Sequence, residues 1–432
     1  MAKSEKKAVE AKISLNSKSY HTSAVLEFLP SGEVRPHFPE KLYDGTFDFV
    51  LEGFSKFEET LSNFTFEGIS ADGARFHTNR LILNSASTPV REGKTYTQLR
   101  GFFGNLVREA TIDNPRDGQG VSYWMRGFEN FGPYKKKTPL GTVRIAGSTK
   151  YTDYNNVGGY IGIVRSFRGR AISLSWEYYA REFLDYLHRV ATFGRCCPLS
   201  ISYCEAFRGA EAIKVFYNPR KNEKPFLSPI HFLNAQSFFD CCIDTYFRSA
   251  KEINKIKYAI DWLNEPQHYN ELRLMVRMMA LENVVENLLD ETEKTRRFAK
   301  TEFRNVRDRL LSAVDTEDID ENDKEELKTA LGNLNKLSLR DKVQNLIQKY
   351  QIPLDGLSNE KIRAAINARN DIVHRGVYYT AKSDEQDPLW QHIITMNELL
   401  VRLIFLLVGY NGMYTSWVDG MTHRSFPDFR KL

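Results

Sequence analysis

An arginine and a histidine lie five positions apart in residues 358–379, where the sequence pattern predicts a helix. At about 100° per residue, Arg369 falls near the middle of an apolar stripe, and Asn370 and His374 lie together on its rim. Histidine titrates near neutral pH and can accept or donate a proton. Arginine stays charged, and one guanidinium can bind two phosphate oxygens at once. The three side chains therefore predict proton transfer beside a bound anion. The stripe consists of Ile362, Ala365, Ile366, Ile372 and Val373.

A simpler interpretation stays open, in which the arginine pairs with an acid of its own domain and the histidine is an ordinary surface residue. An isolated R-x4-H spacing is common in proteins. The small, apolar AAINA run before Arg369 and a rim that is polar only at Asn370 and His374 favour the site. Glu282, at the edge of the apolar surface of an upstream helix, is the candidate partner for Arg369.

The string Arg369-Asn370-Asp371-Ile372-Val373-His374 resembles the R-[polar]-x3-H signature of the HEPN superfamily, the helical domains shared by many defence ribonucleases and toxins. Residues 272–289, LRLMVRMMALENVVENLL, are similar to the long central helix of the ApeA-like HEPN proteins of bacterial phage defence. A related set of HEPN toxins has Tyr two residues after the His, whereas here Tyr378 follows four residues after it. Control by tyrosine modification is therefore not carried over.

The resemblance implies a metal-independent endoribonuclease of an antiphage or toxin-type defence system, acting on RNA, with tRNA as one candidate substrate. Such cleavage needs a base for the 2′-hydroxyl proton, an acid for the leaving 5′-oxygen and a cation near the phosphorane charge. Two motifs facing each other across a homodimer, or a larger assembly of dimers, would supply both proton-transfer groups. Arg369 and His374 are then catalytic, and Asn370 positions the phosphate or the histidine. The predicted RNA contacts on the same helix are Lys361, Arg363 and Arg375.

Two other classes of function remain. A HEPN-like domain without catalysis would bind only nucleotides or partner proteins, with the N-terminal half as its recognition module. By fold analogy and aromatic content alone, that half is also compatible with a carbohydrate-binding sandwich. Assays with total RNA and with a glycan panel would separate these functions.

The chain changes character near residue 230. Residues 13–229 hold short segments rich in β-branched and aromatic residues, which predict a β-rich recognition or regulatory domain, either a sandwich or a curled antiparallel sheet. After the Pro-, Asn- and Lys-rich stretch 217–229, the period becomes 3.6 and predicts an all-α bundle over residues 230–432, the HEPN-like part. Residues 1–12 are Lys-rich and are expected to form a flexible tail. The predicted fold class is α+β.

The long helix expected in the second half is apolar over most of its circumference and should lie at the centre of the bundle. Its two apolar sides are Leu272, Met275, Val276 and Met279, and Leu274, Met278, Leu281, Val285 and Leu288. Two helices are predicted within the β-rich half, and the better defined of them spans residues 176–193. The helices predicted after it are 231–249, 251–264, 267–300, 302–314, 321–334, 338–350, 358–379 and 388–410.

Composition sets the remaining limits. With 432 residues, 42% hydrophobic and 27% charged, the chain has room for two domains and resembles a soluble globular protein. The N-terminus lacks the apolar core of a signal peptide, and the most apolar run, Leu399–Val408, is broken by Arg402 and too short to cross a bilayer, so a cytoplasmic protein without membrane contact is expected.

Cysteine and charge patterns add two expectations. The five cysteines form no C-x2-C pair and have no histidines at zinc-finger spacing, so neither a metal nor a cofactor is expected. Residues 1–230 carry 32 Lys+Arg against 24 Asp+Glu, and residues 231–432 carry 28 against 31. The basic excess of the first half suits a polyanion such as RNA, although it is also ordinary for a soluble protein.

Overall fold

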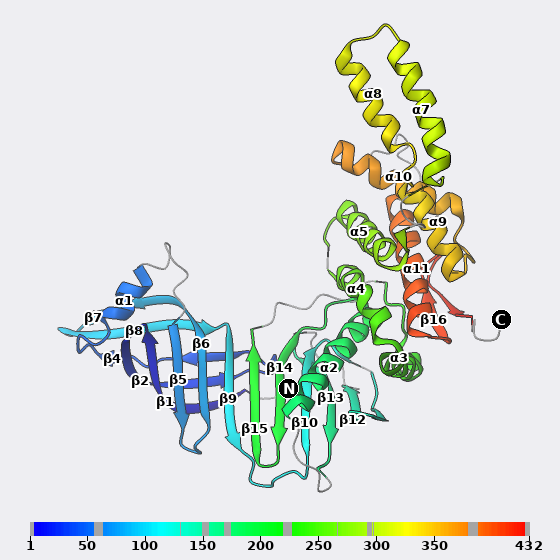
Figure 1. The fold of residues 1–432 in the computed structure, drawn as a ribbon. Helices are drawn as coiled ribbons and strands as arrows, with labels where there is room; N and C mark the ends of the chain where they lie inside the picture. The colour runs from blue at the N-terminus through cyan, green and yellow to red at the C-terminus, as the bar shows by residue number, and fades with distance from the viewer. Residues whose placement is uncertain are drawn as a thin grey trace. The chain divides into compact units, whose positions relative to one another are not determined.

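The structure is a computed structural model, and its described residues fall into two compact units. Met1–Thr192 with Cys197–Pro225 make up the first unit, and Phe193–Cys196 with Phe226–Leu432 make up the second. The first is built on strands and the second on helices (Figure 1). This is the predicted α+β class. The residues that the structure describes are 4–55, 64–129, 131–148, 155–167, 174–218, 227–265, 267–291, 296, 298–378 and 388–427.

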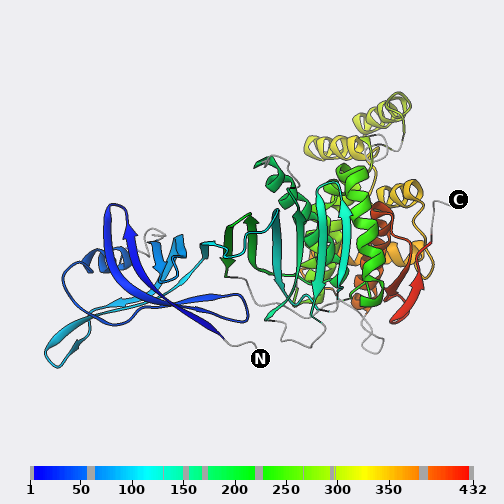
Figure 2. The ribbon, with the colours of Figure 1, turned by 90° about the horizontal axis from the view of Figure 1, so that it is seen from below.

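One antiparallel sheet organises the first unit, so of the two β architectures predicted, the structure has the sheet. Its strands follow the order β11-β12-β13-β10-β14-β15-β9-β6-β5-β1-β2-β3, with β8 joining β6 to β4 and β7. The long strands β1 and β2 bend along their length (Figure 2). The strands are β1 Glu5–Leu15, β2 Lys18–Phe28, β3 Val34–His37, β4 Lys41–Leu42, β5 Phe64–Ser70, β6 Arg75–Ser87, β7 Val90–Arg91, β8 Lys94–Phe103, β9 Asn105–Thr111, β10 Gln119–Arg126, β11 Tyr134–Thr138, β12 Gly141–Gly147, β13 Val157–Arg165, β14 Ile201–Arg208 and β15 Glu211–Tyr217.

The flexible tail predicted over residues 1–12 is wrong for residues 5–12, which belong to β1 and pair with β2 and β5. Val9, Ala11 and Ile13 are buried, and they alternate with charged and polar residues that face outward. A strand with one buried face shows this period of two. Lys6 and Lys12 lie on the outer face, whereas Lys7 lies on the same side as the buried residues, near the strand end, and pairs with Asp72 at 2.6 Å.

Two helices accompany the sheet, α1 (Asp48–Ser55) and α2 (Leu174–Arg195). The second confirms the helix predicted at 176–193. Two hydrogen bonds join α2 to strands of its own unit or their connections: Tyr123 donates to Asp185 over 2.8 Å, and the indole N–H of Trp176 donates to the Leu140 carbonyl over 2.7 Å. A separate core under β1, β2, β5, β6 and β8 contains fully buried aromatic rings, among them Phe47, Phe64, Phe66 and Phe76.

The second unit is a helical bundle with α11 in its interior, packed against α3, α5 and α10. By length and composition α11 could span a membrane, but 78% of its most apolar 18-residue window is buried inside the protein, as in the core helix of a bundle. A two-stranded hairpin, β16–β17, corrects the all-α prediction for residues 230–432. The elements are a 3-10 turn at Phe232–Asn234, α3 Ala235–Lys255, α4 Lys257–Asn264, α5 Asn270–Leu288, α7 Lys300–Thr316, α8 Glu321–Asn333, α9 Leu339–Tyr350, α10 Asn359–Arg375, α11 Pro388–Val408, β16 Met413–Ser416 and β17 Thr422–Ser425.

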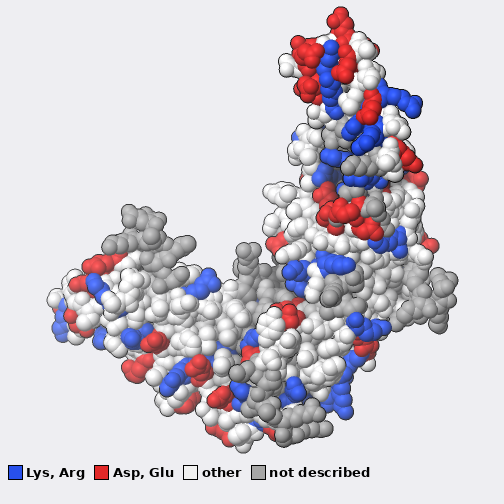
Figure 3. All heavy atoms as spheres, viewed as in Figure 1, with Lys and Arg blue, Asp and Glu red and all other residues white. Residues whose placement is uncertain are grey.

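The long helix predicted at 267–300 is wrong in its extent. It ends at Leu288, because Leu289 adopts an extended backbone (φ −88°, ψ 143°) and buries its side chain. The next long helix, α7, begins at Lys300, and residues 292–295 and 297 lie outside the described part. A hairpin of α7 and α8 follows, with acidic side chains gathered towards its tip (Figure 3).

The expectation that this helix lies at the centre of the bundle is also wrong, because α5 is buried on one side only. Along α5 one side is buried, and it includes the arginine Arg277 as well as Leu274 and Leu281. On the other side Leu272 is 47% exposed and Met279 is 43% exposed. The reason is the packing, since α4, α9, α10 and α11 contact α5 without enclosing it.

Candidate active site

The motif lies on α10, whose two ends are set by local capping. The Ser358 hydroxyl accepts a hydrogen bond from the backbone N–H three residues later over 3.2 Å, which is a standard N-cap. At the other end Gly376 adopts a left-handed conformation (φ 74°), and its N–H donates to the carbonyl four residues earlier over 2.8 Å. The helix predicted at 358–379 therefore ends at Arg375. His374 lies in its last turn.

Arg369 is anchored to α5. Its Nη2 donates to Glu282 Oε1 over 2.9 Å, and its Nη1 donates to Asn370 Oδ1 over 3.2 Å. The arginine side chain is 28% exposed and the glutamate side chain 41% exposed, so this is a half-buried ion pair. The predicted partnership of Arg369 with Glu282 is confirmed. The buried Nε of Arg369 has no hydrogen-bond partner among the described residues.

Asn370 and His374 both face solvent. They are four residues apart on one helix, so their side chains rise from the same rim. Within the described part of the chain, the His374 ring makes no hydrogen bond or ion pair. Both ring nitrogens are therefore available to a ligand, next to an arginine whose position is set by α5.

The buried stripe of α10 differs from the predicted stripe at one position. Val373 is 49% exposed, and Val377, just after the helix, is 48% exposed. Val373 is not part of the buried stripe, because the last turns of α10 are buried on the side of Ala368 and Ile372. Val373 is one turn after Arg369, and the exposed Met279 of α5 is about one turn before its partner Glu282. The ion pair therefore has exposed apolar neighbours on both helices.

The three predicted RNA contacts do not form one cluster. Arg375 is exposed beside His374, and Arg363 is exposed near the start of the helix. Lys361 donates to the Gly356 carbonyl over 3.0 Å and pairs with Asp419 at 3.3 Å. At 1.5 Å per residue, Lys361 and His374 are separated by about 20 Å along the helix axis.

A buried ion pair that was not predicted from the sequence holds the chain leading into α10. Arg402 is 1% exposed; its Nε donates to Glu398 over 2.9 Å, and its other nitrogens donate to the carbonyls of Pro353 (2.6 Å) and Asp355 (2.7 Å). Tyr414 donates to the same glutamate over 2.7 Å, and burial raises the pKa of Tyr414 to about 12. The i,i+4 spacing of Glu and Arg inside an apolar helix was the available signal.

A second histidine lies near the chain that leaves the motif. The Tyr378 hydroxyl is 3.3 Å from His392 Nε2 of α11, and the two rings meet edge to face with centroids 5.7 Å apart. This contact holds the segment after the helix against α11. No pattern in the sequence around His392 predicts this contact.

The described residues contain no group of three or more His, Cys, Asp or Glu side chains arranged to hold a metal ion. The five cysteines are free thiols, and all but Cys241 are buried. The groups positioned around the motif are a guanidinium with its paired carboxylate, an amide and an imidazole.

Residues 278–411 match the family model described as Apea-like HEPN. This match supports the resemblance of the helical unit to the HEPN superfamily, and within it to the Apea-like proteins. The matched segment begins within α5 and extends just past α11, and therefore includes Glu282 and the whole of α10. Such a domain indicates a nuclease-like or defence-related role. Neither the curated proteins nor the solved structures contain a match to the chain.

Proposed function

We propose that the protein is a metal-independent endoribonuclease of an antiphage or toxin-type defence system, acting on RNA in the cytoplasm. The proposal rests on the difference between the two motif residues, Arg369 and His374. Arg369 is positioned by Glu282 over 2.9 Å, whereas His374 is exposed and unbonded within the described residues. A fixed cation can bind a phosphate, and a free imidazole can transfer a proton.

The reaction follows from these groups. One imidazole takes the proton of the 2′-hydroxyl, and the 2′-oxygen attacks phosphorus. The bond to the 5′-oxygen breaks, and a second imidazole, in its protonated form, gives that oxygen a proton. Arg369 stabilises the charge that develops on the phosphorane oxygens. The products are a 2′,3′-cyclic phosphate and a 5′-hydroxyl, and Asn370 supports the position of the phosphate or of His374.

Each chain has one such motif, so the proposed active unit is a homodimer or a larger assembly of dimers. The exposed apolar side chains around the Arg369–Glu282 pair support a contact between copies at this face, because a soluble protein gains by covering them. In a two-fold contact the same face meets itself, which brings the two histidines towards one cleft. The side chains concerned are Met279, Val373 and Val377.

A non-catalytic HEPN-like domain that binds nucleotides or partners is the second candidate. The Arg369–Glu282 pair favours it in one respect, since the glutamate neutralises the arginine charge that a phosphate would otherwise meet. In that case the pair stabilises the bundle and RNA is not cleaved.

Cleavage of RNA by the purified protein distinguishes these candidates. We expect cleavage to persist in excess EDTA, because the proposed proton transfers need only His374 and the charge stabilisation needs only Arg369. The products should carry 2′,3′-cyclic or 3′-phosphates and 5′-hydroxyls, as read by end-labelling and mass spectrometry. Loss of activity on chelation, restored by Mg²⁺ or Mn²⁺, would contradict this chemistry. Absence of cleavage of total RNA would favour the binding function.

If the active site is shared between two chains, a heterodimer with one intact motif should lose most of its RNA cleavage activity. Wild-type chains mixed with a tagged His374→Ala variant should form heterodimers with activity well below half that of the wild-type dimer, because the base and the acid come from different chains. Heterodimers with a tagged His268→Ala variant, which changes an exposed histidine outside the motif, should keep full activity. Activity near half in the first heterodimer would instead show that each motif works alone.

A further inference from the structure

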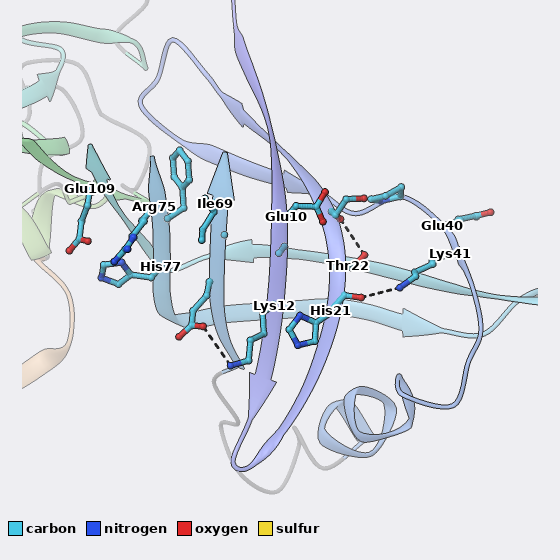
Figure 4. Close-up of a pocket in the computed structure, with 16 residues that line it drawn as sticks. Glu10, Lys12, His21, Thr22, Glu40, Lys41, Ile69, Arg75, His77 and Glu109 are labelled. Carbon is cyan, nitrogen blue, oxygen red and sulfur yellow. Dashed lines mark hydrogen bonds and ion pairs between the residues drawn. The ribbon is translucent and has the colours of Figure 1, made fainter. Parts of the chain in front are cut away.

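A groove lined by charged and apolar side chains lies on the outer face of the N-terminal strands, entirely within the first unit (Figure 4). Its volume is about 890 Å³, and β1, β2, β5, β6 and β9 supply its floor while residues 39–41 line one side. The strand positions that face outward alternate with core positions, so the floor follows the period of two of a sheet with one buried face. The pairing of the strands therefore places side chains from different strands next to one another on this floor.

One cross-strand row of the floor contains both charges and an apolar side chain. Ile69 on β5 lies opposite Glu10 on β1 and opposite Arg75 on β6, and Arg75 lies opposite Glu109 on β9. Neighbours in such a row have their Cβ atoms about 5 Å apart. Ile69 is 55% exposed, so an apolar side chain lies in the open between an acid and a base.

Four charged or titratable side chains of this floor have no polar partner among the described residues. Among the described residues, the side chains of Glu10, Arg75, His77 and Glu109 make no hydrogen bond or ion pair, although Arg75 and Glu109 are register partners of opposite charge. Elsewhere in the groove, groups are paired: Lys12, for example, is 3.7 Å from Glu67. The unengaged groups can therefore bind a ligand without first breaking a protein contact.

The lining restricts the class of ligand. Four carboxylates accompany two lysines and one arginine, so a polyanion such as RNA or DNA meets repulsion along much of the groove. Base or sugar stacking is strongest on a large open aromatic face, but the phenyl ring of the lining, Phe76, is 1% exposed, which leaves only the imidazoles of His21 and His77. A ligand that has an apolar group together with both a positive and a negative charge fits the row.

We propose that this groove binds a peptide segment of another protein, in which an apolar residue is flanked by acidic and basic residues. The apolar side chain covers Ile69, the acidic residue meets Arg75, and the basic residue meets Glu10 or Glu109. The volume, near the upper end for ligand pockets, admits several residues. The groove belongs to the first unit alone, and peptide binding there is independent of RNA cleavage.

The test uses the full-length protein and a randomised dodecapeptide library displayed on phage, followed by fluorescence anisotropy with the enriched peptides. We expect enriched sequences to combine an apolar residue with neighbours of both charges. Ile69→Ala and Arg75→Ala should each raise Kd about tenfold or more, because they remove the apolar anchor and a charged contact. The matched controls Val90→Ala and Arg144→Ala, exposed residues of the same unit outside the groove, should change Kd less than about twofold.

Three results would overturn the assignment. One is the absence of any enriched sequence; another is binding that Ile69→Ala and Arg75→Ala leave unchanged. The third is a single-stranded oligonucleotide that binds with dependence on both residues, which would make the groove a nucleic-acid site. Far-UV circular dichroism and thermal melting check that each variant is folded. If Ile69→Ala is not, Glu109→Gln takes its place and carries the same expectation.

Discussion

Replacement of His374 by alanine is expected to reduce RNA cleavage at least about a hundredfold, which is the lower end of what a general acid or base contributes. The fold should be unaffected. His374 is exposed in the last turn of α10 and makes no hydrogen bond or ion pair within the described residues, so its truncation should change the free energy of unfolding by less than about 0.5 kcal/mol. The rate is measured with an end-labelled RNA under single-turnover conditions.

The matched control is His268→Ala, since His268 is also exposed in the second unit but lies outside the motif. It should cleave at the wild-type rate. Circular dichroism and the oligomeric state by light scattering must be unchanged in both variants. If His374→Ala unfolds, or if it cleaves as fast as the wild type, the histidine is not the proton-transfer group.

The second large effect concerns stability. Arg402→Ala should lower the free energy of unfolding of the helical unit by about 3–5 kcal/mol, the usual cost of leaving a buried charge without its partner. The variant leaves the carboxylate of Glu398 buried, with its side chain 3% exposed, and it removes two donors from the carbonyls of Pro353 and Asp355. Urea unfolding followed by the helical circular dichroism signal measures the change.

Arg340→Ala is the control for this experiment, because Arg340 is an exposed arginine of α9 in the same unit. Its effect should stay within about 0.5 kcal/mol. A loss below about 1 kcal/mol for Arg402→Ala would mean that the ion pair and the loop contacts contribute little net stability, as some buried pairs do. The segment before α10 would then be held by its apolar contacts.

Properties that depend on near neighbours in the chain could be read from the sequence. The change from a period of two to a period of 3.6 near residue 230 separates the strands from the helices, because side-chain direction repeats with these periods in any protein. The motif helix has its own start signal in Ser358 and its own stop signal in Gly376, although the predicted end at 379 passed that glycine. The Arg369–Glu282 pair followed from an acid at the edge of one apolar surface and a charge within another.

Properties that depend on distant parts of the chain were decided by the tertiary structure. Residues 5–12 form a strand because β2 and β5 offer hydrogen bonds and a core, and their own lysines conceal this. Val373 and Met279 are apolar and at helical spacing, yet no described element covers them fully, so they are exposed at the proposed dimer face. Likewise, Arg402 interrupts an apolar run in the sequence, but in the fold it meets two carbonyls from a loop nearly fifty residues earlier. The sequence alone therefore determined the periodicity, the residues of the motif and the capping residues of its helix. Tertiary packing decided which apolar faces are covered and which group each charged side chain contacts. Burial depends on neighbours that the local sequence pattern does not specify.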